Sequence, residues 1–312
     1  MREHHMRWVV AAATTVALAA CGATSSTTPS TSAGAHFPVT IAQASGASVT
    51  ITKQPHRIVS LSATATEMLF AIDAGSQVVA VDDQSNYPVS APKTKLSGFQ
   101  PNIEAIAAFG PDLVVAVDDN SGLAHGLAAL NVPVVIEPAA KNVDDSYKQI
   151  EQLGAATGRV AEASALVRKM RADLAAIVAT IPKPAKQLKV YHELDDTYYS
   201  ATSATFIGQV YALLSLKNIA DGATAAAGDY PQLSAEYIVS SSPDLIVLAD
   251  TKCCHQDLST VAGRPGWSSI TAVKTGQVIN VDDDIASRWG PRVIDFLRAL
   301  APHVKQMEGQ AA

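Results

Sequence analysis

The chain has 312 residues, of which 48% are hydrophobic and 17% are charged, and its formal net charge is −6. This length suits two lobes of ordinary size, and the hydrophobic fraction excludes a disordered chain. The acidic balance argues against a nucleic-acid partner, because nucleic-acid-binding proteins present a basic face to the phosphates. Small ligands and protein partners stay open.

The first twenty residues predict export. Arg2 and Arg7 give a positive start, and residues 8–20 form a mostly apolar run that is too short to span a bilayer. We therefore assign residues 1–20 to a secretory signal peptide. The small residues before Cys21 resemble the lipobox of bacterial lipoproteins, in which the cysteine is acylated and becomes the mature N-terminus. The alternative is an ordinary secreted protein with a chance cysteine.

Residues 21–36 are expected to form the lipidated start and a flexible tether. Gly22 to Ala35 are almost all Ser, Thr, Ala, Gly and Pro, a composition that cannot bury a core. A lipid, a tether and a folded body in this order predict a protein anchored to the outer face of the cytoplasmic membrane.

The N-terminal lobe is assigned to residues 37–157. Short β-branched runs alternate there with helical patterns, which predicts a mostly parallel sheet with helices on both faces. The expected strands are 57–61, 77–81, 112–117 and 132–136, and the expected helices are 64–71 and 103–109.

The pattern then changes, and apolar residues recur at helical spacing until Pro182 and Pro184 end the run. A helix of about twenty residues is roughly 30 Å long, which is enough to join two lobes. We assign the connecting helix to residues 158–181.

Alternation resumes over residues 182–312, the C-terminal lobe. The sequence therefore predicts an α/β fold of two doubly wound α/β lobes joined by one long helix, with the ligand cleft between the lobes. In such sheets ligands bind outside the carboxyl ends of the strands. The expected strands are 188–193, 244–249 and 277–281, and the expected helices are 206–215, 234–240 and 291–299.

One phrase occurs in both lobes. A short helix carrying Glu104 leads into a strand that begins Pro-Asp-Leu at Pro111, and a helix carrying Glu236 leads into another Pro-Asp-Leu strand at Pro243. This repetition indicates a weak internal duplication.

Several motifs together resemble the iron-siderophore and cobalamin solute-binding family of ABC importers, over almost the whole mature body. The resemblance implies two α/β lobes joined by one long helix. It also implies a non-enzymatic, monomeric binding protein without a cofactor or metal, which delivers a small ligand to a permease dimer. The motifs are Pro55–Leu61, Thr66–Leu69, Ser85–Pro88, Pro101–Glu104, Pro111–Val114, Arg264–Trp267 and Ser287–Arg292.

Within that family, the Ser85–Pro88 segment is most similar to the cobalamin binders, in which the tyrosine of this loop packs on the flat corrin. Phe99 and Tyr230 stand here where those binders typically have Trp, and Val117 stands where a further Trp can lie. The ligand-binding residues that the resemblance implies are Tyr87, Phe99, Tyr199, Tyr230, Asp284 and Arg288.

Other ligands and activities stay open. Haem needs an axial ligand, for which Tyr87, Tyr199 and His255 are available. A ferric siderophore favours several arginines, of which Arg288 is well placed and Arg264 and Arg292 are possible. An extracytoplasmic hydrolase is less favoured, because the sequence has no G-x-S-x-G, P-loop, G-x-G-x-x-G or H-E-x-x-H motif.

The resemblance also implies a docking role for Glu104 and Glu236. Glutamates at the matching positions of the family form salt bridges to arginines of the permease. The alternative is that both are solvated acids at a helix start, where the helix dipole favours negative charge.

The three cysteines predict one disulfide. Acylation would consume Cys21 and leave Cys253 and Cys254 as adjacent thiols in an oxidising compartment. We expect a vicinal disulfide that stiffens the loop after the strand at 244–249. The alternatives are a free dithiol or, with His255, a metal site.

Overall fold

The computed structural model describes residues 36–44, 46–119, 122–182, 186–223 and 228–311. The predicted signal peptide, Cys21 and all of the predicted tether except His36 lie outside the described residues. Within the described ranges, no helix is both long enough and apolar enough to cross a membrane.

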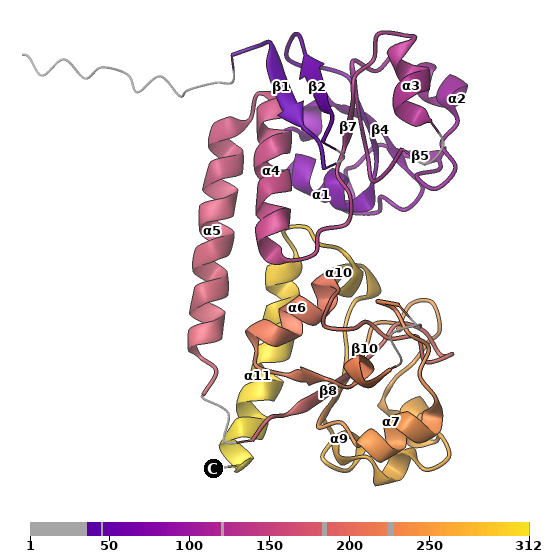
Figure 1. Ribbon diagram of the computed structural model, residues 1–312, viewed down its shortest axis with the longest axis vertical. Coiled ribbons are helices and arrows are strands. Elements are labelled where there is room, and N and C mark those ends of the chain that lie inside the picture. The colour runs from indigo at the N-terminus through magenta and orange to yellow at the C-terminus, as the bar shows by residue number, and fades with distance from the viewer. Residues whose placement is uncertain (1–35, 45, 120–121, 183–185, 224–227, 312) are drawn as a thin grey trace, which may run out of the picture. The chain divides into compact units, whose positions relative to one another are not determined.

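The N-terminal lobe is built on a five-stranded parallel sheet with the strand order β5-β4-β3-β6-β7 (Figure 1). An antiparallel hairpin of β1 (Val39–Ala42) and β2 (Ser48–Ile51) precedes it. The strands are β3 (Ile58–Leu61), β4 (Val78–Asp82), β5 (Lys93–Leu96), β6 (Leu113–Ala116) and β7 (Val134–Ile136). The helices are α1 (Ala63–Ala71), α2 (Ile103–Ala107), α3 (Leu123–Ala128) and α4 (Val143–Thr157).

The C-terminal lobe repeats this plan with a four-stranded parallel sheet in the order β11-β10-β8-β9. The strands are β8 (Lys189–Glu193), β9 (Lys217–Asn218), β10 (Leu245–Leu248) and β11 (Val278–Asn280). The helices are α6 (Phe206–Leu213), α7 (Ala235–Ser241), α8 (Leu258–Ala262), α9 (Thr271–Lys274), α10 (Asp283–Ser287) and α11 (Val293–Ala311).

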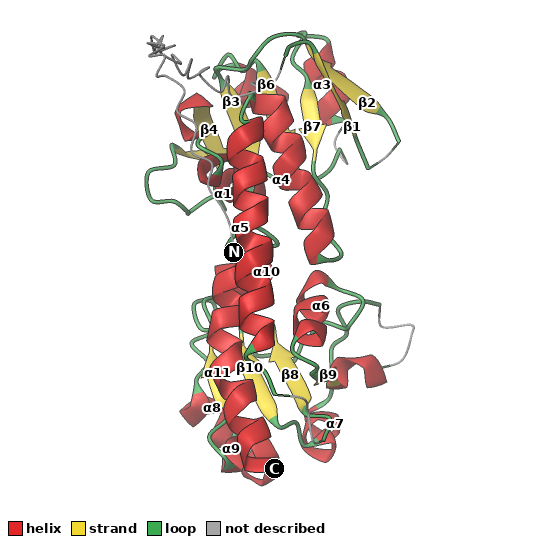
Figure 2. Cartoon of the chain, turned by 90° about the vertical axis from the view of Figure 1, so that its left-hand side faces the viewer, coloured by secondary structure: helices red, strands yellow, loops and turns green. Residues whose placement is uncertain are grey.

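The long helix α5 (Val160–Ala179) follows α4 after a turn at Gly158, whose φ of 78° suits glycine. It packs against α4 and against α11, and Figure 2 shows it running beside the elements of both lobes. The sequence predicts no separate element over residues 143–157, where the structure has α4.

The closing helix is longer than expected. It was expected to end at residue 299, but α11 continues past Pro302. Proline removes one helical hydrogen bond, yet Val304 and Met307 beyond it are buried in the core, and this burial favours continuing the helix.

The sheets are buried on both faces, which explains the continuous apolar strands. In β10, Leu245 and Val247 belong to a core that also contains residues of the N-terminal lobe, whereas Ile246 and Leu248 pack into a separate cluster on the other face. The shared core runs through α4, α5 and α11 and holds the two lobes together.

The repeated Pro-Asp-Leu phrase has the same structural role in both lobes. Asp112 accepts backbone hydrogen bonds from His56 at 2.9 Å and Arg57 at 2.8 Å, and so fastens β6 to the start of β3. Asp244 accepts one from Lys189 at 2.9 Å, and fastens β10 to the start of β8. Each aspartate therefore ties the first parallel strand of its lobe to a central neighbour.

A buried acid lies at the end of β7. Glu137 is 4% exposed and its Oε1 has no hydrogen-bond partner among the described residues. Burial alone raises its pKa from 4.5 to about 8, so the folded protein holds this proton at neutral pH while the unfolded chain releases it.

We predict that stability falls as pH rises from about 5 to about 8, because only the folded state keeps the Glu137 proton over that range. Each pH unit lowers the free energy of unfolding by up to about 1.4 kcal/mol. Replacing Glu137 with Gln should make this part of the profile less steep, measured by urea unfolding across the pH range. The variant Glu151→Gln, at an exposed position on α4, should keep the slope. An equal slope in Glu137→Gln and wild type would contradict the assignment.

Candidate functional site

Four aromatic side chains are exposed on loops at the carboxyl ends of the sheets. Tyr87 and Phe99 follow β4 and β5, and Tyr199 follows β8. Tyr230 lies on the segment that pairs with Tyr199. These side chains account for four of the seven large hydrophobic side chains that are exposed in the described part of the chain. Their exposed fractions are 46% for Tyr87, 84% for Phe99, 41% for Tyr199 and 51% for Tyr230.

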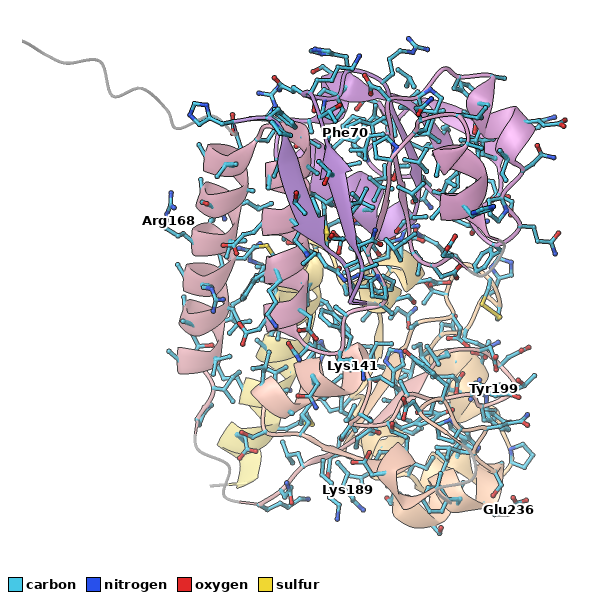
Figure 3. The ribbon with its side chains drawn as sticks, turned by 45° about the horizontal axis from the view of Figure 1, so that its top comes forward. Phe70, Lys141, Arg168, Lys189, Tyr199 and Glu236 are labelled. Atoms are coloured by element: carbon cyan, nitrogen blue, oxygen red, sulfur yellow. A yellow bond between two sulfur atoms is a disulfide. The ribbon has the colours of Figure 1, made fainter. Side chains whose placement is uncertain are left out.

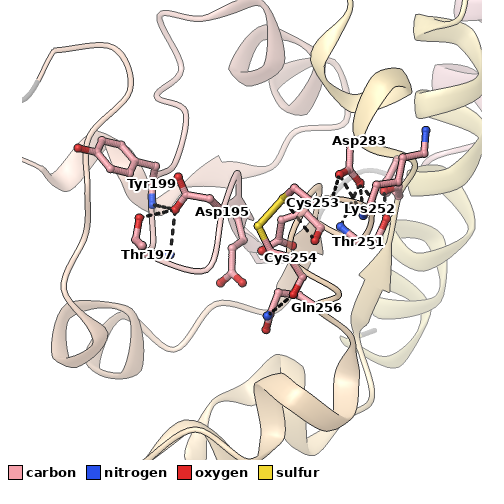
Figure 4. The surroundings of a disulfide bond; sticks show 12 residues. Asp195, Thr197, Tyr199, Thr251, Lys252, Cys253, Cys254, Gln256 and Asp283 are labelled. Atoms are coloured by element: carbon pink, nitrogen blue, oxygen red, sulfur yellow. Dashed lines mark hydrogen bonds between the residues drawn. A yellow bond between two sulfur atoms is a disulfide. The ribbon is translucent and has the colours of Figure 1, made fainter. Parts of the chain in front are cut away.

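Local hydrogen bonds set the positions of Tyr199 and Tyr230. The Asp195 carboxylate accepts hydrogen bonds from the backbone of Thr197 at 2.9 Å and of Tyr199 at 3.4 Å (Figure 4). The chain at Tyr199 forms an antiparallel bridge with Gln232, which brings the segment carrying Tyr230 alongside. The two rings therefore come from adjoining segments of the same lobe.

The loop that carries Tyr87 is held by a hydrogen bond to α1 and by a contact with Arg292. Buried Ser85 hydrogen-bonds to Thr66 of α1 at 2.8 Å. The guanidinium of Arg292 lies over the Tyr87 ring, 4.3 Å from its centroid, which is cation–π geometry. One ring face is thus covered by the C-terminal lobe.

Phe99 depends on a close approach of the backbone. A Cβ added at the preceding Gly98 would lie 2.7 Å from both Leu61 O and the Asp82 carboxylate. A residue with a side chain would therefore push the turn that carries Phe99 away from the ends of β3 and β4.

Asp284 and Arg288 have protein partners across the lobes. Arg288 donates to Glu67 at 2.7 Å, to the Asn86 side chain at 2.9 Å and to the Gln84 carbonyl at 3.0 Å. Asp284 accepts from Arg288 at 2.7 Å and from Asn86 at 2.9 Å. Contact of these two side chains with a ligand stays a prediction.

The centre of this network is Glu67, a residue of α1 that is 3% exposed. Besides Arg288, it accepts hydrogen bonds from Nε and Nη2 of Arg292 in the C-terminal lobe. Its hydrogen bond raises the pKa of Arg292. The sequence predicted no role for Glu67, and it offered Arg292 only as a possible arginine for a ferric siderophore.

The pKa of Asp284 reflects the same network. Burial alone would raise it, but hydrogen bonds from Lys252 and Asn86 and the positive charge of Arg288 outweigh burial and hold the pKa below its ordinary value. Asp284 is therefore ionised at neutral pH and contributes a fixed negative charge to the network.

A second buried cluster lies under the loops of the C-terminal lobe. Arg264 donates to both oxygens of fully buried Glu193, at 2.6 and 2.7 Å. Asp250, at the end of β10, is equally buried, and burial together with the Glu193 charge raises its pKa to about 8. One arginine faces two acids, so Asp250 is neutral at physiological pH.

Cys253 and Cys254 form a disulfide in the loop that follows β10 (Figure 4). Cys253 is exposed and Cys254 is half-buried. The Asp283 carboxylate of α10 accepts hydrogen bonds from the backbone N–H groups of Thr251, Lys252 and Cys253, between 3.0 and 3.2 Å. His255, next to the disulfide, is exposed. In the described part of the chain, no group of three His, Cys, Asp or Glu side chains is placed to hold a metal ion.

One pocket borders the aromatic residue Tyr87, and a larger pocket lies elsewhere in the N-terminal lobe. One of about 230 Å³ borders Tyr87 and Arg292 and extends between α5 and α11. A larger one, of about 780 Å³, lies between β1, α4 and residues 136–141, and none of the four aromatic residues lines it.

Glu104 and Glu236 occupy equivalent positions in the two lobes. Each is the second residue of its helix, α2 or α7, after a side-chain cap by Asn102 or Ser234. Both are exposed, and neither is paired with a cation in the described part of the chain. Figure 3 shows Glu236 projecting outward from the C-terminal lobe.

The chain matches the model of a family described as periplasmic binding protein over residues 58–285. That range covers most of both lobes. The chain belongs to the periplasmic binding protein family. It is a solute-binding protein of an ABC transporter, a class that works outside the cytoplasm and pairs with a permease.

Individual relatives agree with this assignment. The chain is 34% identical to YvrC of Bacillus subtilis, named an uncharacterized ABC transporter substrate-binding lipoprotein, over 86% of each chain. It is 30% identical to a protein of Halobacterium salinarum named cobalamin-binding protein, over 85% of this chain and 73% of that one. A solved structure from Staphylococcus epidermidis, described as a possible iron-binding, periplasmic solute-binding protein, has a TM-score of 0.69 and 28% identity. It covers 81% of this chain and 99% of that one. The predicted family and the two-lobed α/β fold are thus confirmed.

We predict that Glu67→Ala destabilises the protein by about 3 kcal/mol or more, because it leaves the guanidinium groups of Arg288 and Arg292 buried without their carboxylate. Urea unfolding measures this. The matched control Glu162→Ala removes an ion pair with Arg159 whose side chains are 36% and 31% exposed, and it should cost less than about 1 kcal/mol. Equal losses of unfolding free energy in the two variants would show that Glu67 contributes no more than an exposed ion pair does.

Proposed function

We propose that the protein captures a corrinoid such as cobalamin and delivers it to the permease of an ABC importer. The observation that carries this proposal is the set of four exposed aromatic rings on the loops at the carboxyl ends of both sheets. Flat rings offer stacking area at little cost in conformational entropy. A ring that buries about 80 Å² against a ligand contributes about 2 kcal/mol.

The state of the arginines supports a corrinoid over a ferric siderophore. A polar or anionic siderophore calls for guanidinium groups that are available to it. Arg288 and Arg292 are instead engaged by Glu67, and Arg264 is engaged by Glu193. The name of the Halobacterium salinarum relative points the same way.

Haem is the second candidate, because Tyr87, Tyr199 and His255 are all exposed and each offers an axial ligand. Incubation with cobalamin, haem or a ferric siderophore, followed by desalting and an absorption spectrum, separates the three. A retained cobalamin spectrum supports the proposal, and a retained haem spectrum with none for cobalamin overturns it.

The corrinoid proposal predicts that Tyr87→Ala and Tyr199→Ala each weaken cobalamin binding at least about tenfold, since each removes a stacking ring worth about 1.4 kcal/mol or more. Isothermal titration calorimetry with cobalamin and cobinamide measures the affinity. The control Val89→Ala, on the same loop as Tyr87 and 84% exposed, should bind as wild type does. Absence of heat and of tryptophan quenching at micromolar cobalamin would eliminate the corrinoid.

We further propose that Cys21 carries a lipid that holds the protein at the outer face of the membrane. The support is the small-residue segment before Cys21 and the lipoprotein name of the Bacillus subtilis relative. Replacing Cys21 with Ala should move the protein from the membrane fraction to the soluble one, and continued membrane fractionation would argue against the anchor.

We propose that Glu104 and Glu236 dock the protein on the permease. They are exposed, they occupy equivalent positions in the two lobes, and they have no cation partner in the described chain. A two-fold permease with one arginine site per half suits such a pair, since rim charges set orientation and association rate.

The docking proposal predicts that Glu104→Ala/Glu236→Ala binds cobalamin normally but transports it several-fold more slowly in proteoliposomes. Substitution of both glutamates by Lys should slow transport further, because the lysines would repel the arginines of the permease. The single variant Glu151→Ala, at an exposed position on α4, serves as the control. Normal transport by the double Ala variant would rule out docking through these residues.

A further inference from the structure

The disulfide loop of the C-terminal lobe is connected to the Tyr87 loop of the N-terminal lobe by an unbroken series of polar contacts. It begins at α10, where Asp283 accepts three backbone N–H groups of residues 251–253 and the Thr251 hydroxyl at 2.8 Å. The Asp283 carboxylate thus holds the backbone of the loop to α10, and the Lys252 side chain adds ion pairs with Asp282 and Asp284.

The next residue of α10 extends the series. Asp284 accepts from Lys252 Nζ at 2.7 Å and from Asn86 Nδ2 at 2.9 Å. Asn86 immediately precedes Tyr87, and its side-chain oxygen accepts from Arg288 at 2.9 Å. Residues of the disulfide loop and the residue before Tyr87 therefore share one carboxylate.

Further hydrogen bonds join the disulfide loop to the rest of the C-terminal lobe. The Asp250 carbonyl accepts the Cys254 N–H at 3.1 Å, and Gln256 links the Cys254 carbonyl to Arg264 with hydrogen bonds of 2.8 Å each. Arg264 in turn pairs with buried Glu193 at the end of β8. The loop thus lies between the base of the Tyr199 segment and the loop that carries Tyr87.

The geometry points to Cys253–Cys254 as a thiol-exchange site whose redox state sets ligand affinity, an inference that rests on the proposed function. A bond between adjacent cysteines closes a small ring that includes their peptide bond, and so restricts the backbone that Asp283 holds. Cys253 is an exposed residue, so the bond lies at the surface of the lobe, where a small thiol approaches from solvent. No partner protein is required.

Reduction breaks the S–S bond and forms two S–H groups. A dithiol reductant supplies the two electrons and two protons and becomes a disulfide itself. The released loop no longer fixes Lys252 against Asp284, and the Tyr87 loop loses part of its support. The oxidised form therefore binds ligand more tightly, and by reciprocity bound ligand favours the oxidised form.

The first measurement establishes the starting state. Thiol counting on lipidated, denatured and unreduced protein should find no free thiol, and two free thiols overturn the inference. Cobalamin is then titrated into oxidised protein, dithiothreitol-reduced protein and Cys253→Ser/Cys254→Ser. Reduction and the double substitution should each weaken binding about tenfold, and dithiothreitol should have no effect on the double variant.

The reciprocal measurement separates this role from a merely structural one. Saturating cobalamin should lower the midpoint potential of the cysteine pair in dithiothreitol redox buffers, by about 30 mV for a tenfold change in affinity. Asp283→Asn should weaken binding without adding its full effect to that of the double Ser variant, because both act on one loop. Unfolding curves of the ligand-free forms show whether each variant is folded.

The outcomes are distinct. If oxidised wild type does not bind cobalamin, the proposed function fails and this inference fails with it. If oxidised, reduced and Ser-substituted forms bind cobalamin equally, or if cobalamin leaves the midpoint potential unchanged, this inference alone is overturned and the proposed function stands.

Discussion

Two arginines of the C-terminal lobe share one buried carboxylate of the N-terminal lobe, and the geometry of the site depends on this interaction. Glu67 lies on α1, while Arg288 directly follows α10 and Arg292 directly precedes α11. Burying these charges is costly, and only their mutual pairing and further hydrogen bonds offset that cost. The pairing places Arg292 over the Tyr87 ring and Arg288 against Asn86. The contact between the lobes therefore also fixes the position of the Tyr87 loop.

The site combines this fixed polar contact with exposed aromatic surfaces. The charged groups pair with one another, so they fix the positions of the loops and do not present unpaired charges to a ligand. Phe99 is largely exposed to solvent, and Tyr87, Tyr199 and Tyr230 are each about half exposed. Such a division suits a flat, neutral ligand recognised by stacking, with the chain's polar groups holding the rings in place.

The fold was largely predictable because its strands are buried on both faces and read as short apolar runs between helical patterns. Elements that lack this signal were missed. Edge strand β5 alternates lysines with Thr94 and Leu96, and its pattern is that of a half-exposed segment. The hairpin β1–β2 is mostly exposed as well. Helix α11 was cut short because Pro302 is ordinarily a stop signal, and only packing in the core reveals that the helix continues.

The candidate site was predictable in part. Family resemblance implied Tyr87, Phe99, Tyr199, Tyr230, Asp284 and Arg288 as ligand-binding residues, and the structure shows the four aromatic side chains exposed on loops. The partner of Arg288 was not predictable, because Glu67 is 221 residues away in the sequence and a glutamate inside an apolar helix gives no hint of which cation it meets. The same holds for Asp283, whose hydrogen bonds to the disulfide loop join residues about thirty positions apart in the sequence.

The most direct test of corrinoid binding is a crystal structure of the protein grown with cobalamin. We predict a corrin ring lying between Tyr87 and Phe99 of one lobe and Tyr199 and Tyr230 of the other, with Glu67 still bound to Arg288 and Arg292. A corrin bound away from these four rings, or a complex in which Glu67 has released both arginines, would contradict it.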